Sequence, residues 1–216
     1  MLLTGKLLYT AVLLMLAVNT GVANTQNASI AADKKQQVIE IHRKVITQLV
    51  QSADVQQCLD REQHKADSLQ TILQIDQKWP TQVQYVHRVI EHPCAKLFKQ
   101  YIQDPVYHFS EIMLTDDSGA LVAAYPRPSD YWQGDEQKFI QPAATSKKYI
   151  SHEDWDASTG TFSFFISVPV FYSQHFAGVL ITGINVTTEY LDQLSMQELL
   201  IIDVKPEDES NIKPDQ

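Results

Sequence analysis

The sequence predicts an α+β fold in which a long N-terminal helix and small helices pack on one antiparallel sheet of about five strands. Two observations support this fold class. The first is a change of pattern near residue 109, where helical periodicity over 33–108 gives way to short strands and turns over 109–196. The second is that neighbouring strands are joined by short connections, which suit antiparallel strands, whereas parallel strands need long crossovers.

The helical half carries apolar residues at spacings of three and four across 33–59, without an interrupting proline or glycine. This spacing predicts an amphipathic helix, with Asp33 as its N-cap. A second helix is expected over 62–78 and shorter helices over 83–91 and 94–102, because prolines separate these segments.

The second half carries the strands. Pro169 cannot donate to a strand ladder, so the strand that contains it is expected at a sheet edge or with a bulge. Short helices are expected over 135–144 and 187–196. Apolar and β-branched runs between turn residues predict strands at 111–115, 120–125, 149–155, 161–172 and 177–184.

The first 23 residues have the pattern of an export signal. Lys6 precedes an apolar run over 7–18, and Gly21-Val22-Ala23 supplies the small residues that signal peptidase requires. Spanning a bilayer takes about 20 apolar residues, and the run over 7–18 is shorter than that. Cleavage near Ala23 is therefore expected, with an uncleaved anchor as the alternative. The exported chain would then carry a linker over 24–32 and a polar C-terminal tail over 197–216.

The chain is acidic, with a formal net charge of −9, and loss of Lys6 with the signal would make it one unit more negative. Such a charge repels nucleic acids and anionic lipid surfaces, which excludes them as partners. The two cysteines, Cys58 and Cys94, both follow the signal. In an oxidising compartment one disulfide between them is expected, and two buried thiols are the alternative.

The segment 125–136 concentrates aromatic and charged side chains. Aromatic rings offer broad apolar walls, and charged groups can hold the polar ends of a small molecule. Asp130 or Glu136 could accept from an ammonium group, and Arg127 could clamp a carboxylate. The alternative is a structural loop, in which Trp132 plugs the core and Arg127 is solvated. The candidate ligand-binding residues are Tyr125, Arg127, Asp130, Tyr131, Trp132, Glu136 and, in a later strand, Trp155.

A second polar and aromatic cluster spans 152–156. Its carboxylates suit Ca²⁺, but their spacing matches no Ca²⁺ loop, and successive residues of a strand face opposite sides. Neither a metal nor a cofactor is therefore expected. The sequence also lacks a nucleophile elbow, a phosphate-binding glycine loop and a paired-histidine zinc motif, so an enzyme is not expected.

Three segments of the second half resemble the Cache family of extracytoplasmic sensor domains, also called PDC domains, which are PAS-like. The first is 111–123 (EIMLTDDSGALVA), which is similar to the family's hairpin with its D-x-x-G turn. The second is 129–136 (SDYWQGDE), which resembles the loop of one PDC subgroup. The third joins 166–170 (ISVPV) to 178–180 (GVL) and is similar to the strand pair that closes the family's sheet.

The resemblance implies a pocket between the sheet and the loop-helix segment over it, which binds small metabolites such as amino acids or carboxylates. It also implies a periplasmic location and a role in signal transduction. The chain ends soon after its last expected helix, so the signal is expected to pass to a membrane-bound receptor or kinase. The alternative is an interaction module without a ligand that regulates a membrane sensor, and a pocket filled by its own side chains would favour it.

Overall fold

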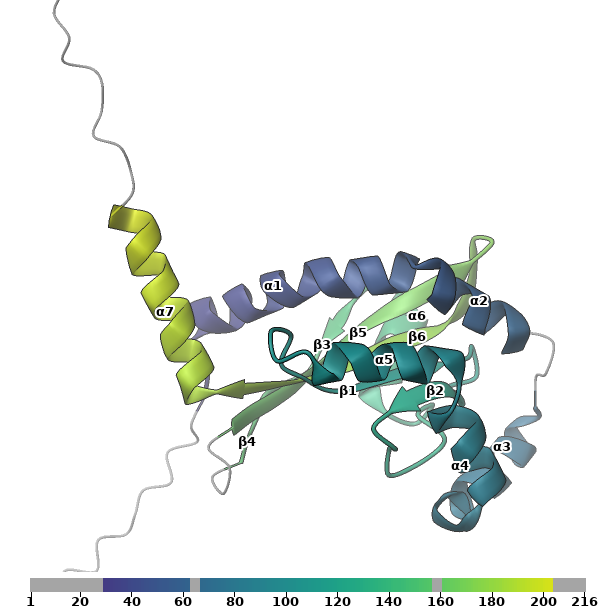
Figure 1. The fold of residues 1–216 in the computed structure, drawn as a ribbon. Coiled ribbons are helices and arrows are strands. Elements are labelled where there is room, and N and C mark those ends of the chain that lie inside the picture. Colours follow the sequence, from purple (N-terminus) through teal and green to yellow (C-terminus); the bar gives the residue numbers. More distant parts are fainter. Residues whose placement is uncertain (1–28, 63–66, 157–160, 204–216) are drawn as a thin grey trace, which may run out of the picture.

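The computed structural model describes residues 29–62, 67–156 and 161–203 (Figure 1). Within these residues, seven α-helices and a short 3₁₀ helix accompany one six-stranded sheet whose pairs are all antiparallel. The predicted α+β fold class is therefore confirmed. The expected export signal, the turn at 157–160 and the end of the polar tail lie outside the described residues.

Five of the helices form the first half of the chain. The second helix expected from the sequence starts later than predicted, because Ser68 is its N-cap and its hydroxyl accepts from Thr71 N. The helices are α1 (Ala32–Gln51), α2 (Ala53–Glu62), α3 (Leu69–Gln77), α4 (Val83–Ile90) and α5 (Pro93–Gln103), with the 3₁₀ helix η2 (Trp79–Thr81) before α4.

The single helix predicted over 33–59 is wrong at Ser52, where α1 ends and α2 begins. Ser52 has an extended backbone with ψ 144°, and its hydroxyl accepts from Val55 N at 3.2 Å. A serine that caps the next helix in this way interrupts the helix although the apolar spacing continues. The N-cap of α1 is Ala31, and the predicted cap Asp33 lies in the first turn instead.

The sheet has one strand more than expected, because the segment predicted over 149–155 forms two short strands. Between them the Ser151 hydroxyl, rather than a backbone carbonyl, accepts from Phe165 N at 2.9 Å. The order across the sheet is β2 (Leu121–Tyr125), β1 (Phe109–Thr115), β6 (His175–Thr187), β5 (Thr161–Tyr172) and β3 (Tyr149–Ile150), while β4 (Asp154–Asp156) also pairs with β5.

The prediction for Pro169 is confirmed. Pro169 pairs with Val179 of β6, and the ladder shifts register between Val170 and Phe171. On the other side of β5, the pairing with β3 reaches only Ser167. The missing N–H of Pro169 therefore falls next to a bulge, beyond the part of β5 that β3 covers.

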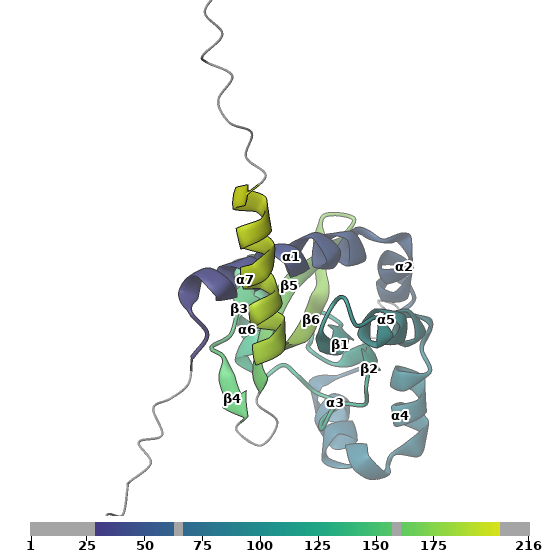
Figure 2. The same ribbon diagram turned by 60° about the vertical axis from the view of Figure 1, so that its left-hand side comes forward.

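Helices cover both faces of the sheet (Figures 1 and 2). One core lies between the sheet and α1, α2 and α5, and it includes Ile112 and Leu114 of β1. The other core lies between the opposite face and α3, η2, α4 and α6 (Gln137–Thr145), and it includes Met113 of β1. Alternation along β1 thus supplies both cores. Trp79 and Tyr131 are both buried in the second core.

The predicted disulfide is present and joins Cys58 of α2 to Cys94 of α5. It closes a loop with a sequence separation of 36. His92 lies beside it, and the donor atoms of His92 and the two cysteines lie within 4.8 Å of one another. The sulfurs are bonded to each other and offer no thiolate to a metal ion.

The last helix, α7 (Thr188–Asp203), continues directly from β6 and extends beyond the end predicted at 196 (Figure 1). Its Tyr190 ring stacks on His108 with the ring centroids 3.9 Å apart, which fixes the helix to the start of β1. None of the helices within the described residues is long and apolar enough to cross a membrane.

Candidate ligand-binding site

The loop between β2 and α6 is held by a carboxylate that is distant in the sequence. Asp76 of α3 accepts from two consecutive backbone amides, Tyr131 N at 2.8 Å and Trp132 N at 2.9 Å, through the same Oδ1. The loop also extends the sheet, since Gln133 N donates to Gly119 O at 2.8 Å. The loop therefore has a fixed conformation rather than the freedom of an unattached connection.

Two glycines permit this arrangement. Gly119 has φ +87°, in the region that L-residues avoid, and a Cβ there would lie 2.7 Å from the backbone of Gly134. A Cβ at Gly134 would lie 2.3 Å from Nε1 of Trp132, which donates to Ser118 O at 2.9 Å. The loop can therefore lie against the β1–β2 turn only because neither position has a side chain.

Five polar side chains from this loop, the start of α6 and β1 are linked by two pair contacts and by charge effects on Glu111, and we name them the acidic cluster. Lys138 Nζ lies 3.0 Å from Oε2 of Glu136, and Gln133 Nε2 donates to Oδ1 of Asp130 at 2.9 Å. Glu111 comes from β1. Its side chain lies over Gly183 of β6, where a Cβ would come within 2.8 Å of Glu111 Cγ. The acidic cluster consists of Glu111, Asp130, Gln133, Glu136 and Lys138.

The electrostatics of the acidic cluster favour a cation. Burial raises the pKa of the Glu111 carboxyl, the nearby Lys138 ammonium opposes this rise, and the carboxylates of Glu136 and Asp130 add to it. Three carboxyl groups thus share one ammonium group. A positively charged ligand group placed among them would stabilise the ionised form of Glu111.

Gln133 supplies an unused acceptor in the acidic cluster. The side chain is fully buried, and its Oε1 has no hydrogen-bond partner among the described residues. Its amide nitrogen is directed at both the backbone and the carboxylate oxygen of Asp130, which fixes the orientation of the amide. A buried polar atom without a partner is rare and costly, so a donor from another molecule would satisfy it.

The structure brings only some of the sequence-predicted residues together. Asp130 and Glu136 lie in the acidic cluster. Tyr131 and Trp132 flank it, but the Tyr131 ring is buried in the second core, where burial raises its pKa to about 12 and its hydroxyl accepts from Arg88 at 2.9 Å. The aromatic side chains of this loop therefore support it more than they line a free space.

Tyr125 and Arg127 lie elsewhere, in a surface depression of about 270 Å³ between α4, α5 and the end of β2. Trp155 is farther away. It pairs with Phe162 at the end of β5 opposite Val186, whereas the loop adjoins the β1–β2 turn near the other end of β6. The seven predicted residues thus occupy three separate places.

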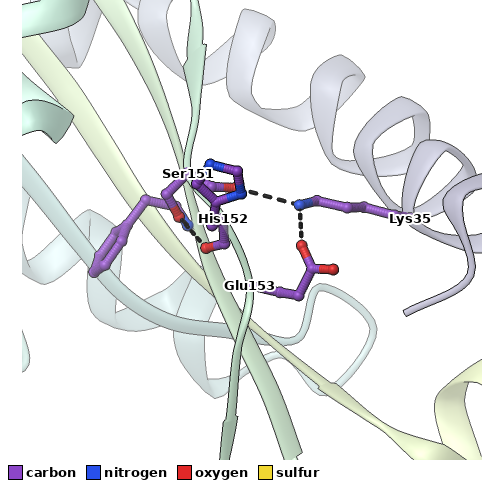
Figure 3. A network of polar contacts seen from close by, with 5 residues as sticks. Lys35, Ser151, His152 and Glu153 are labelled. Atoms are coloured by element: carbon purple, nitrogen blue, oxygen red, sulfur yellow. Dashed lines mark hydrogen bonds and ion pairs between the residues drawn. The ribbon is translucent and has the colours of Figure 1, made fainter. Parts of the chain in front are cut away.

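The second polar cluster, at 152–156, is a link between α1 and the sheet edge (Figure 3). Lys35 of α1 forms an ion pair with Glu153 and donates to Ser151 O at 3.3 Å. The hydrogen bond from Lys35 lowers the pKa of the Glu153 carboxyl. The Glu153 carboxylate thus ties the sheet edge to a lysine of α1.

Three members of the acidic cluster, Glu111, Gln133 and Lys138, were not among the predicted site residues. Glu111 carried a usable signal, because it is a carboxylate directly before the apolar run 112–114 of β1. Gln133 and Lys138 carried no such signal in the sequence, since glutamine and lysine are ordinary residues of loops and helix starts. Asp76 could not be linked to the loop at all, because 55 positions separate it from Tyr131.

Comparison with known proteins finds similarity among solved structures. No protein-family model and no curated protein matches this sequence. Among solved structures, the chain is similar to the ligand-binding domain of a Pseudomonas aeruginosa amino acid chemoreceptor in complex with GABA, at 18% identity and TM-score 0.37. That match covers 62% of this chain and 64% of the receptor domain, so the chain spans just under two thirds of that structure.

Two further structures are of the same kind. The sensory domain of a Campylobacter jejuni chemoreceptor with isoleucine bound has 14% identity and TM-score 0.35, over 77% of this chain and 67% of that one. A domain of a sensory box/GGDEF family protein from Vibrio parahaemolyticus has 17% identity and TM-score 0.39, over 76% and 59%. The similar structures are thus sensory domains, and at these identities and TM-scores the likeness assigns no ligand.

Proposed function

We propose that this chain is an exported Cache/PDC-type sensor domain that binds a small amine-bearing metabolite, such as an amino acid, in the acidic cluster. It is released in the periplasm by cleavage near Ala23, and it reports its ligand state to a membrane-bound receptor or kinase. The role is one of binding rather than catalysis. The Cys58–Cys94 disulfide agrees with an oxidising compartment.

The observation that carries this proposal is the unpaired Oε1 of buried Gln133, whose amide nitrogen donates to Asp130, one of three carboxyl groups that act on one another electrostatically. An ammonium group has three donors and no acceptor, so it can satisfy Gln133 and carboxylates at the same time. A ligand carboxylate would instead meet the charges of Glu111, Asp130 and Glu136, with only Lys138 to oppose them. The ligand is therefore expected to enter with its amine first.

The test is a thermal-shift screen of the exported protein against amino acids, small carboxylates, amines and purines. A ligand at about 100 times its dissociation constant adds about 2.7 kcal/mol to the free energy of unfolding. For a chain of this size the melting temperature then rises by roughly 5–10 °C. Asp130→Asn should remove the response to amines, while Asp117→Asn, an exposed carboxylate on the β1–β2 turn, should keep it.

The second candidate function is a ligand-free interaction module that regulates a membrane sensor. The buried positions of Trp79 and Tyr131 favour it, since both rings fill the space between the sheet and its cover. Under this alternative, no compound in the screen shifts the melting temperature, and Asp130→Asn leaves capture of a membrane sensor partner unchanged. A shift by an amine that Asp130→Asn abolishes would rule the alternative out.

A further inference from the structure

The strand β2 lies at the edge of the sheet and adjoins α4 and α5 (Figures 1 and 2). A basic depression lies between these elements, apart from the acidic cluster. Its volume is about 270 Å³. It shares no residue with the acidic cluster. The lining residues come from the end of α4, one side of α5 and the segment after β2, and they are Ile90, Glu91, Ala95, Lys96, Lys99, Tyr125, Pro126 and Arg127.

The charge of the basic depression opposes that of the whole chain. Three cations, Lys96, Lys99 and Arg127, line it together with one carboxylate, Glu91, on a protein whose net charge is −9. Lys96 and Lys99 are three positions apart in α5 and so lie on one side of the helix. Arg127 approaches from the β2 segment. Opposed cations around a hollow concentrate positive potential in it and attract anions.

The walls suit a small molecule rather than a free ion alone. Tyr125 is half-buried, and the Lys99 ammonium lies 5.5 Å from the centroid of its ring. Ala95, a buried small residue of α5, also lines the depression. The guanidinium of Arg127 offers paired donors that match a carboxylate or a phosphate, and the lysines add point charges.

We propose that the basic depression is a second, independent binding site, for a small anion that carries several carboxylate or phosphate oxygens. It binds an anion, whereas the acidic cluster is proposed to bind a cation, so the two sites do not compete for the same group. Arg127 therefore serves an anion, as its chemistry suggests, but in a different place from Asp130 and Glu136. The inference does not depend on the proposed amine site.

The test is calorimetric titration of the exported, disulfide-bonded protein at low ionic strength with citrate, inorganic phosphate and, as a monovalent control, acetate. Citrate or phosphate should bind more tightly than acetate, and whichever of them binds better identifies the ligand group. The double variant Lys99→Gln with Arg127→Gln should weaken that binding at least about tenfold, because each substitution removes a charge-assisted hydrogen bond. Added salt should weaken it as well.

The matched control is the double variant Lys147→Gln with Lys148→Gln, which removes the same charge from exposed positions outside the basic depression. All four side chains are exposed, so both variants should keep the wild-type melting temperature. Equal weakening in both variants would show a diffuse charge effect and overturn the proposal. Absence of citrate and phosphate binding up to about 10 mM, well above a millimolar dissociation constant, would overturn it too.

Discussion

The carboxylate of Asp76 determines the conformation of the loop that carries most of the acidic cluster. Its Oδ1 accepts from Tyr131 N and Trp132 N at 2.8 and 2.9 Å. A hydrogen bond to a charged group contributes about 1.5–3 kcal/mol. Asp76 is half-buried, so the lower end of that range applies. Because Asp76→Ala removes both hydrogen bonds, at about 1.5 kcal/mol each, it is expected to lower the free energy of unfolding by about 3 kcal/mol.

The conservative variant separates the oxygen from the charge. Asp76→Asn can keep one carbonyl oxygen against both amides, so we expect it to cost only about 1 kcal/mol. Urea denaturation followed by tryptophan fluorescence measures both values, and the melting temperature of Asp76→Ala should fall by roughly 6–12 °C. Asp117→Ala, on the exposed β1–β2 turn, should stay within about 0.5 kcal/mol of wild type.

Two results would refute this explanation of the loop. One is an Asp76→Ala variant as stable as Asp117→Ala, which would mean that the two amides find other acceptors. The other is an Asp76→Asn variant as unstable as Asp76→Ala, which would mean that charge rather than an acceptor oxygen holds the loop. In the first case the position of Asp130 and Gln133 could not be attributed to Asp76, and in the second case it could not be attributed to the two hydrogen bonds from the loop amides.

Three further predictions follow from buried groups and cross-links. Burial lowers the pKa of His42 and of His108 in the folded protein, so the unfolded chain binds protons more readily. The free energy of unfolding should therefore fall as the pH drops below about 6.5. A free energy of unfolding that stays constant between pH 7 and 5.5 in urea titrations would contradict this. Replacing Cys58 and Cys94 by serine should cost about 4 kcal/mol in the chain-entropy model, and an unchanged urea midpoint would refute a structural role. Lys35→Met should lower the free energy of unfolding by at most about 1 kcal/mol, because the ion pair of Lys35 with Glu153 is partly exposed. Amide hydrogen exchange should become faster at the start of α1 but not in β6.

The elements with strong local signals were predicted well from the sequence. The strand 161–172, the β1–β2 turn and the bulge near Pro169 agree with the structure because glycine, proline and alternating apolar residues act over a few positions. The break at Ser52 is also a local feature, but the prediction there relied on apolar spacing alone and missed it. Its hydroxyl competes with the helix locally, and apolar periodicity does not register a side-chain cap.

The site was only partly predictable. The loop 129–136 was identified, and Asp130 and Glu136 both act on the Glu111 carboxyl, because they are close in sequence and both precede α6. Glu111 joins them across the sheet through the register between β1 and β6, which no local pattern specifies. Trp155 was grouped with the loop by the family resemblance, but the pairing of β4 with β5 places it at the opposite end of the sheet.

The measurement that tests the proposed amine site most directly is the pH dependence of ligand affinity in wild type and in Glu111→Gln. The pKa of Glu111 is raised by burial, and an ammonium group in the acidic cluster would lower it again, so binding should release a proton. Affinity for an amine identified in the screen should therefore rise as the pH rises above about 4.5, the ordinary pKa value for a glutamate, in wild type. The rise should be much smaller in Glu111→Gln. An affinity that falls with rising pH, or an identical profile in the variant, would contradict an amine beside Glu111.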